Sequence, residues 1–304
     1  MRLVYFGSSE FAVPALRAVS DSVVLVVTQP PKPIGRKKLL TPTPVEVVAR
    51  ELGLSVETPP KARASEFVEL VQNMNADALL VASYGQILSE KLLGASRQGG
   101  INLHASLLPK YRGAAPIQRA ILDGELETGI TLMQMDKGLD TGDMIATQST
   151  RICETETAGE LESRLGEIAA AMAIEWMPRI CSGEYTRAPQ DDSHATYAAK
   201  MTHEDGAVSL SEPSEIGYRR YRACTPKPGA FLKTRYGALG LIAVALGSKL
   251  DGKPGVVIVE SGKLFLHCHT GSLELQVVRP EGRSTMKAID WINGLRLKSG
   301  DNLL

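Results

Sequence analysis

The chain has 304 residues, with 34 basic and 34 acidic side chains and therefore a formal net charge of zero. With 43% hydrophobic and 22% charged residues it is not a disordered or fibrous chain, and its bulk charge gives no sign of a nucleic-acid partner. No apolar run approaches the ~20 residues of a membrane span, and the four cysteines form no Cys-x-x-Cys pair, so we expect a cytoplasmic globular protein without membrane anchor, zinc site or disulfide framework.

The first 150 residues alternate between strand-like and helix-like runs. Strands are predicted at residues 2–6, 23–28, 78–83, 100–104 and 130–135, and helices at 14–19, 44–52, 65–73 and 116–123. This alternation predicts an α/β fold of Rossmann-like type, in which a mostly parallel sheet is covered by helices on both faces. In such open sheets, ligands bind at the carboxyl ends of the strands.

The second half of the chain has a different pattern. A long helix is predicted over residues 156–180, with Thr157 and Glu160 as a capping box at its start. After a polar stretch come a helix at 216–223, short strands at 230–234, 239–246, 256–259, 263–267 and 272–278, and a closing helix at 286–295. Such short strands indicate a small barrel. We therefore predict an α/β domain over residues 1–183, a linker over 184–205 and a smaller β-barrel domain over 206–304.

Side chains that can carry chemistry lie at the end of the predicted strand 100–104. Asn102 and His104 are two residues apart, so both emerge on one face of that strand. An amide can donate to a developing oxyanion, and an imidazole can take a proton. A carboxylate that orients the imidazole completes a set able to move an acyl carbon onto an amine. Asp136 and Asp140 are both candidates, and spacing alone does not decide between them.

These residues resemble the folate-dependent formyltransferases. That family is marked by Asn-x-His-x-Ser-Leu-Leu-Pro followed by Leu-Asp-x-Gly, and the chain has these runs at residues 102–109 and 139–142. The resemblance extends over nearly the whole chain through the runs at residues 4–12, 32–38, 111–118 and 197–201. It implies that Asn102, His104 and Asp140 are catalytic, and that the C-terminal domain is an oligonucleotide-binding-like barrel.

The resemblance also implies a folate site. In the family the Ser-Leu-Leu-Pro run lines the site of the co-substrate 10-formyltetrahydrofolate, and the loop that follows the strand 78–83 is similar to the loop around the pterin. The expected folate contacts are Ser106, Leu107, Leu108, Pro109, Tyr84, Gly85, Gln86 and Ile87. No metal is expected to take part.

A basic loop lies between the second strand and the second helix. Lys32 to Lys38 could be an ordinary solvated charge run, but several prolines and a glycine hold it in a long loop, which favours a function. In similar enzymes this loop inserts at the acceptor end of tRNA, and Arg36 matches the key arginine. The tRNA contacts implied in this way are Arg36, Lys37, Lys38 and Lys200.

The basic loop and the C-terminal domain resemble those of family members that act on tRNA. They imply transfer of a formyl group to the α-amino group of methionine on initiator tRNA. This reaction is a step of translation initiation and draws on one-carbon metabolism. The alternative is transfer to an amino sugar nucleotide, which needs the same catalytic core but not the basic loop. No obligate protein partner is evident, so a monomer is expected.

Overall fold

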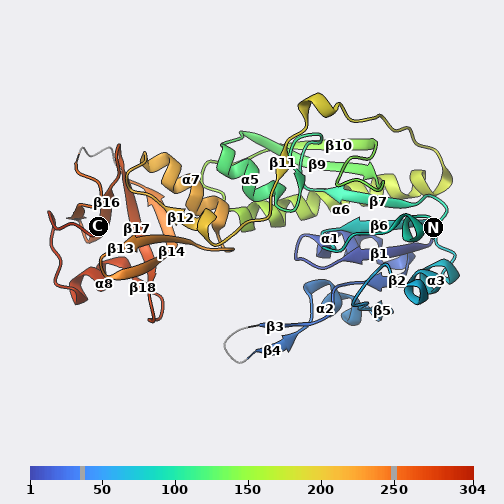
Figure 1. Ribbon diagram of the computed structural model, residues 1–304, viewed down its shortest axis with the longest axis horizontal. Helices are drawn as coiled ribbons and strands as arrows, with labels where there is room; N and C mark the ends of the chain where they lie inside the picture. The colour runs from blue at the N-terminus through green and yellow to red at the C-terminus, as the bar shows by residue number, and fades with distance from the viewer. Residues whose placement is uncertain (35–37, 248–251) are drawn as a thin grey trace. The chain divides into compact units, whose positions relative to one another are not determined.

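The computed structural model describes residues 1–34, 38–247 and 252–304, which divide into two compact units (Figure 1). Unit 1 comprises residues 1–116, 127–151 and 162–199, and unit 2 comprises residues 117–126, 152–161 and 200–304. The described helices are α1 Ala12–Val19, α2 Pro44–Glu51, α3 Ser65–Asn73, α4 Glu90–Leu93, α5 Pro116–Asp123, α6 Ala158–Ser182, α7 Ser214–Cys224 and α8 Ala288–Gly294, with 3-10 turns at Ser20–Ser22, Asp192–His194 and Glu204–Gly206.

Unit 1 is built on a seven-stranded sheet in the order β10-β9-β7-β6-β1-β2-β5. The strands from β7 to β5 in this order are parallel, whereas β9 and β10 are antiparallel additions at one edge. The strands are β1 Leu3–Gly7, β2 Val23–Val27, β5 Val56–Glu57, β6 Ala78–Ala82, β7 Gly100–His104, β9 Glu127–Gln134 and β10 Met144–Arg151. The predicted α/β fold with a mostly parallel sheet is confirmed.

The central strands are buried on both faces, as a parallel sheet between helices requires. All five residues of β1 and of β6 are buried. On one face Phe6 packs in a core with Leu79 and with Phe67 from α3. On the other face the Tyr5 hydroxyl donates to the backbone carbonyl of Ala12 at the start of α1. This two-sided core fixes the carboxyl ends of β1, β6 and β7 at one edge.

The predicted basic loop begins and ends as a β-hairpin. β3 Lys32–Ile34 pairs antiparallel with β4 Leu39–Thr41, and Figure 1 shows this hairpin standing away from the seven-stranded sheet. Leu39 and Leu40 are 65% and 71% exposed. The hairpin leads into α2, which begins with Pro44 at a position where its missing N–H costs nothing.

Unit 2 contains a mostly antiparallel sheet in the order β12-β13-β14-β17-β16-β15, with β18 paired to β17. Its strands are β12 Ala207–Val208, β13 Ala230–Thr234, β14 Gly237–Leu246, β15 Val257–Glu260, β16 Lys263–His267, β17 Ser272–Pro280 and β18 Met286–Lys287. Ser261 and Gly262 join β15 to β16 with φ of 51° and 75°, the left-handed pair that a two-residue hairpin turn needs. The predicted second, β-rich domain is confirmed.

Candidate active site

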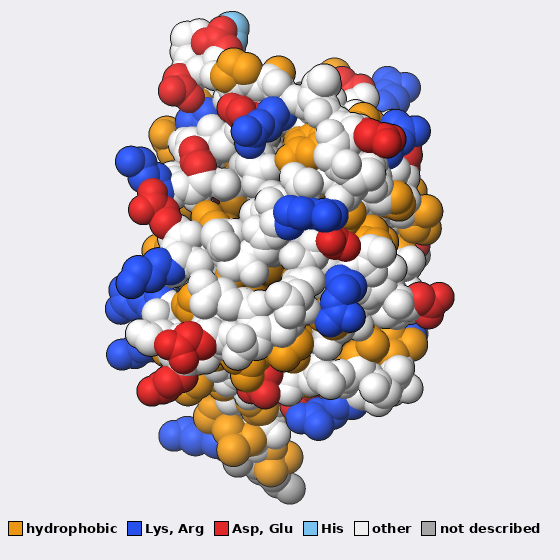
Figure 2. All heavy atoms as spheres, turned by 90° about the vertical axis from the view of Figure 1, so that its right-hand side faces the viewer, with side chains coloured by type: hydrophobic (Ala, Val, Ile, Leu, Met, Phe, Trp, Pro, Cys, Tyr) orange, Lys and Arg blue, Asp and Glu red, His pale blue; other side chains and the backbone are white. Residues whose placement is uncertain are grey.

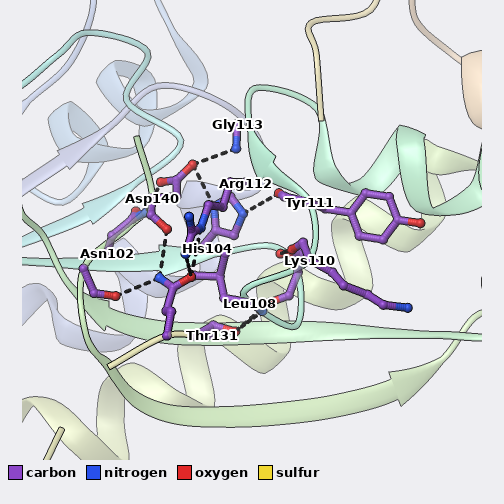
Figure 3. Close-up of polar contacts among 12 residues, drawn as sticks. Asn102, His104, Leu108, Lys110, Tyr111, Arg112, Gly113, Thr131 and Asp140 are labelled. Atoms are coloured by element: carbon purple, nitrogen blue, oxygen red, sulfur yellow. Dashed lines mark hydrogen bonds and ion pairs between the residues drawn. The ribbon is translucent and has the colours of Figure 1, made fainter. Parts of the chain in front are cut away.

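Asn102 and His104 meet Asp140 at the end of β7 (Figure 3). Asn102 Nδ2 donates to Asp140 Oδ1 at 3.4 Å, and His104 Nδ1 lies 3.7 Å from Asp140 Oδ2. Asp140 lies in the loop between β9 and β10, 36 residues beyond His104 in the sequence. The structure thus brings together the three side chains that the sequence predicted as a catalytic set.

The imidazole of His104 is held by a backbone carbonyl. His104 is only 6% exposed, and its Nε2 lies 2.9 Å from the carbonyl oxygen of Tyr111. Because a carbonyl can only accept, Nε2 carries the hydrogen when the ring is neutral. Nδ1 then presents its lone pair on the side of Asp140 and Asn102. The nitrogen that can take a proton is therefore the one beside the carboxylate.

Asp140 is held at both its side chain and its backbone. Its φ of 54° is left-handed, a region that a non-glycine residue occupies at a cost in free energy. Its Oδ2 accepts from the backbone N–H of Gly113 at 2.8 Å. Its backbone carbonyl accepts from Gln190 Nε2 at 2.8 Å. These contacts place the carboxylate beside His104 and Asn102.

The alternative carboxylate, Asp136, lies in a different environment. It is exposed, and its carboxylate accepts from the backbone N–H of Gly138 and from the hydroxyl of Thr141 at 2.8 to 2.9 Å. These contacts brace the turn that precedes Asp140. No described contact joins Asp136 to His104. The geometry therefore favours Asp140 over Asp136 as the partner of the imidazole.

Residues 185–198, part of the stretch interpreted as a linker, run along the active-site loops of unit 1. Within them β11 Tyr197–Ala198 pairs in parallel with β8 Arg112–Gly113. The hydroxyl of Thr196 accepts from the backbone N–H of Tyr111 at 2.8 Å. Gln190 bridges Arg112 and the Asp140 loop. These contacts were not predicted from the sequence, because a polar stretch without periodicity carries no signal of what it binds.

Arg112 is a buried cation next to this cluster. Its side chain is 2% exposed, and its guanidinium donates to Gln190 Oε1 and to Asp192 Oδ1. Burial by itself lowers the pKa of Arg112. The hydrogen bond and negative charge of Asp192, with a smaller effect of Tyr197, outweigh burial, so the pKa of Arg112 lies above its usual value. The guanidinium remains charged and acts as a permanent donor.

The Ser-Leu-Leu-Pro run forms a turn that is braced from within. Ser106 is buried, and its hydroxyl donates to the backbone carbonyl of Lys110 at 2.6 Å. Thr131 on β9 donates to the carbonyl of Ser106 and accepts from the backbone N–H of Leu108, whose peptide bond to Pro109 is cis. The Ser106 hydroxyl thus holds the shape of the loop. Leu107 and Pro109 are partly exposed.

The second predicted folate loop follows β6. Tyr84 turns its ring into the core, edge-on to Phe6 with ring centroids 5.2 Å apart, and burial raises the pKa of its hydroxyl to about 12. The amide of Gln86 is bonded to the backbone of Ala62 and Pro59. Gly85 has a φ of 82°, and Ile87 is 86% exposed. Ile87 and the backbone around Gly85 are therefore what this loop presents to a ligand.

The residues predicted to contact tRNA are only partly described. Arg36 and Lys37 lie outside the described residues. Lys38 is exposed with a φ of 47°, and Lys200 is exposed in unit 2. Figure 2 shows basic and acidic side chains interspersed on the face that it presents, in keeping with the zero net charge. Attraction of a polyanion must therefore come from local clusters.

The described part of the chain offers neither a metal site nor a membrane span. Among residues 1–34, 38–247 and 252–304, no three His, Cys, Asp or Glu side chains are grouped so that they could hold a metal ion. Over the same ranges, no helix is both long enough and apolar enough to cross a membrane.

Two family models match this chain. The model described as formyl transferase matches residues 1–177, and the model described as formyl transferase, C-terminal domain, matches residues 200–296. A methionyl-tRNA formyltransferase from Halorhodospira halophila is 42% identical over 99% of this chain and 98% of the relative. A protein of the same name from Geobacter metallireducens is 40% identical over 100% of this chain and 98% of the relative.

Solved structures show the same fold at lower identity. The N-formyltransferase from Helicobacter canadensis, solved with folinic acid and dTDP-3-aminofucose, has a TM-score of 0.66 and 17% identity, with 90% of this chain and 98% of that chain covered. HypX from Aquifex aeolicus, solved with tetrahydrofolic acid, has a TM-score of 0.69 and 15% identity, with 98% of this chain and 48% of that chain covered.

Proposed function

The chain belongs to the formyl transferase family, and we propose that it transfers the formyl group of 10-formyltetrahydrofolate to methionine carried by initiator tRNA. The products are N-formylmethionyl-tRNA and tetrahydrofolate, and the step serves translation initiation. The observation that carries this proposal is the contact of Asn102, His104 and Asp140 at the carboxyl end of β7. The relatives at 40 to 42% identity, which bear the name methionyl-tRNA formyltransferase, support the acceptor.

His104 acts as the base in this mechanism. The neutral α-amine of methionine attacks the formyl carbon, and the proton that it loses goes to Nδ1 of His104. This assignment is supported by the Tyr111 carbonyl, which keeps the hydrogen of the neutral ring on Nε2. The imidazolium that forms lies beside the carboxylate of Asp140, 3.7 Å away, which stabilises the new positive charge.

Asn102 stabilises the tetrahedral intermediate. Its amide nitrogen has two hydrogens, and the one directed at Asp140 makes a long bond of 3.4 Å. The amide can therefore donate to the oxygen of the formyl group as negative charge develops there, a contribution on the order of 3–4 kcal/mol in comparable sites. His104 then returns the proton to the folate nitrogen as the bond from that nitrogen to the formyl carbon breaks.

The remaining assignments follow from this reaction. The folate would lie against Ser106 to Pro109 and the loop Tyr84 to Ile87, with the exposed Ile87 as an apolar contact for the pterin. The tRNA would be bound by Arg36, Lys37, Lys38 and Lys200. We assign catalysis to residues 1–183, a linker to 184–205 and tRNA binding to 206–304, in a cytoplasmic monomer.

The amino sugar nucleotide remains the alternative acceptor to test. A formyl-transfer assay should offer the purified chain 10-formyltetrahydrofolate with either initiator Met-tRNA or an amino sugar nucleotide. We expect formylation of Met-tRNA alone. A thermal shift gives an independent readout, because folate should stabilise the chain under both hypotheses and charged initiator tRNA only under the first. Formylation of the sugar with no reaction of Met-tRNA would overturn the proposed acceptor.

A further inference from the structure

We propose that Gln190, locked in place by Arg112, is a positioning residue that holds Asp140 in its catalytic conformation. This inference rests on the proposed formyl transfer. It assigns a role to a residue that lies between the two family-model matches, which cover residues 1–177 and 200–296. Gln190 does not contact the reacting side chains of His104 or Asn102 and acts through the backbone of the Asp140 loop.

The Gln190 amide has a hydrogen-bond partner for every donor and acceptor site. Its Nε2 donates to the backbone carbonyl of Asp140 at 2.8 Å and to that of Gly142 at 2.7 Å. Its Oε1 accepts from Nε and Nη2 of Arg112 at 3.0 and 2.7 Å. Two N–H groups and two lone pairs are all that a primary amide offers. Gln190 therefore fixes the carbonyls on both sides of Thr141.

Asp140 needs this support because of its backbone conformation. With a φ of 54° it is in a region that is unfavourable for a non-glycine residue, and it stays there only if its surroundings hold it. Its carboxylate must also reach the N–H of Gly113 and the imidazole of His104. A rotation of the Asp140 carbonyl toward another partner would move the carboxylate away from both. The bond from Gln190 opposes that rotation.

Arg112 determines which way the Gln190 amide points. An amide can flip by exchanging its oxygen and nitrogen, and the two orientations have the same shape. The flipped orientation would place the NH₂ group of Gln190 against two N–H groups of a guanidinium that is 2% exposed. Donors would then face donors in a buried site, which is costly. Arg112 thus holds the Gln190 nitrogen toward the Asp140 loop.

A second glutamine in unit 1 provides a matched control. Gln134 Nε2 donates to the backbone carbonyls of Gln98 and Gly100, each at 3.0 Å, and its Oε1 accepts from the hydroxyl of Tyr185 at 3.2 Å. It makes the same kind of bridge as Gln190, but at the opposite end of β7 from His104. Gln134 contacts the Asp140 loop only through its backbone, whose N–H donates to the carbonyl of Asp143 at 2.8 Å. Substitution of its side chain removes comparable hydrogen bonds and keeps that backbone bond.

The test compares Gln190→Glu with Gln134→Glu. Glutamate at position 190 can still accept from Arg112, but it has no N–H for the carbonyls of Asp140 and Gly142. We expect kcat for Met-tRNA formylation to fall on the order of 10²-fold, because a small misplacement of a catalytic group has an effect of that size. KM for the folate and for Met-tRNA should change less than about twofold. Gln134→Glu should lower Tm similarly and keep the parent's kcat.

A double-mutant cycle separates positioning from general destabilisation. In an Asp140→Ala background the carboxylate is already gone, so Gln190→Glu should cause almost no further loss of kcat. If Gln190→Glu unfolds, Gln190→Met keeps the side-chain volume and is carried through the same cycle. Parent-like kcat in the folded Gln190 variant, or losses that multiply in the Asp140→Ala background, would overturn the positioning role. A parent chain that does not formylate Met-tRNA would instead refute the proposed function.

Discussion

The Asp140 loop and the β3–β4 hairpin are built in opposite ways. Around Asp140, backbone and side-chain groups of distant segments are paired with one another, and the polar side chains of His104 and Arg112 are buried. In the hairpin the strands are three residues each, and Leu39 and Leu40 are largely exposed. The proposed catalytic groups are therefore held by the fold, whereas Lys38, one of the proposed tRNA contacts, is exposed directly before β4.

The two regions should therefore contribute to different free energies, one to stabilisation of the transition state and the other to binding of tRNA. Groups that are fixed before the substrate arrives can stabilise the transition state without reorganising, which raises kcat. Exposed charges on a hairpin attract phosphates and act mainly on binding, and salt screens them. The comparison therefore predicts that substitutions near Asp140 change kcat, and that substitutions in the hairpin change KM for tRNA and its salt dependence.

The largest effect is expected from removal of the proposed base. His104→Ala should lower kcat for formylation on the order of 10²–10⁴-fold, the range of general acid–base catalysis. Folate affinity should remain nearly unchanged, since the proposed role is proton transfer. Single-turnover kinetics and equilibrium folate binding give the two quantities. A variant with near-normal kcat would remove the imidazole from the mechanism.

Removal of the proposed oxyanion donor should have the next largest effect. Asn102→Ala should reduce kcat by about 10²–10³-fold with little change in KM, because the donor acts mainly in the transition state. Steady-state kinetics with each substrate varied in turn measures both constants. The idea of a preorganised cluster would fail if the loss appeared in KM alone.

The hairpin should show the reverse pattern. Arg36→Ala should raise KM for Met-tRNA about tenfold or more, and Arg36→Lys should restore it only partly, because lysine copies the charge of arginine but not its planar, stacking donor group. Folate affinity should stay at the parent value. Arg17 on α1, an exposed arginine paired with Glu51, provides the matched alanine control.

Salt gives a second readout for the same region. Raising the salt concentration should weaken tRNA binding, and the slope of log K against log salt should fall by about one for each lysine removed at Lys37 and Lys38. Filter binding at four or five salt concentrations gives this slope. Equal slopes in parent and variant, or tRNA kinetics of Arg36→Ala like those of the parent, would show that the hairpin is only a solvated surface.

The smallest effect concerns the stability of the fold and should change neither kcat nor KM for tRNA. Thr157 and Glu160 form the predicted capping box of α6, with Thr157 donating to Glu160 from its backbone and its hydroxyl. These bonds, the backbone one first, lower the pKa of Glu160 below its usual 4.5. Thr157→Ala should cost about 1 kcal/mol of the free energy of unfolding at neutral pH.

The pH dependence of that cost follows from the direction of the shift. A lowered pKa in the folded state contributes stability above the unfolded value of 4.5, and this contribution is lost as the pH falls through the lowered value. Urea unfolding at pH 7 and below pH 4 should therefore show a smaller difference between parent and Thr157→Ala at acid pH. Alanine keeps the backbone bond to Glu160, so a pH-independent difference would contradict the share of the pKa shift assigned to the Thr157 hydroxyl.

Local patterns in the sequence predicted much of this fold. Period-two and β-branched runs located β1, β2, β6, β7 and β9, and the capping box located the start of α6. β10 was not predicted, because Met144–Arg151 has three apolar residues followed by polar ones, without a clear period, and none of them is buried. The hairpin of β3 and β4 at the base of the basic loop was not predicted either, because it depends on pairing across the loop and no strand-like run of residues marks it.

The candidate site was predictable where a motif marks it and not where chain segments far apart meet. Asn102 and His104 follow from their chemistry and spacing, and Asp140 follows from the resemblance. The inward ring of Tyr84 could not be read from its loop, because a loop residue gives no sign of which way it faces. Gln190 and Thr196 act by hydrogen bonds to loops about 50 and 85 residues earlier, and no spacing in the sequence records such pairings.

The path of residues 185–198 along the active-site loops has a consequence for synthesis on the ribosome. Every proposed catalytic side chain has been made once Asp140 is joined to the chain, but Gln190 follows 50 residues later. At about 5–20 residues per second, translation of that interval takes about 3–10 s. A nascent chain that stalls in it would hold an unbraced Asp140 loop, so the enzyme should acquire its activity late in translation and abruptly.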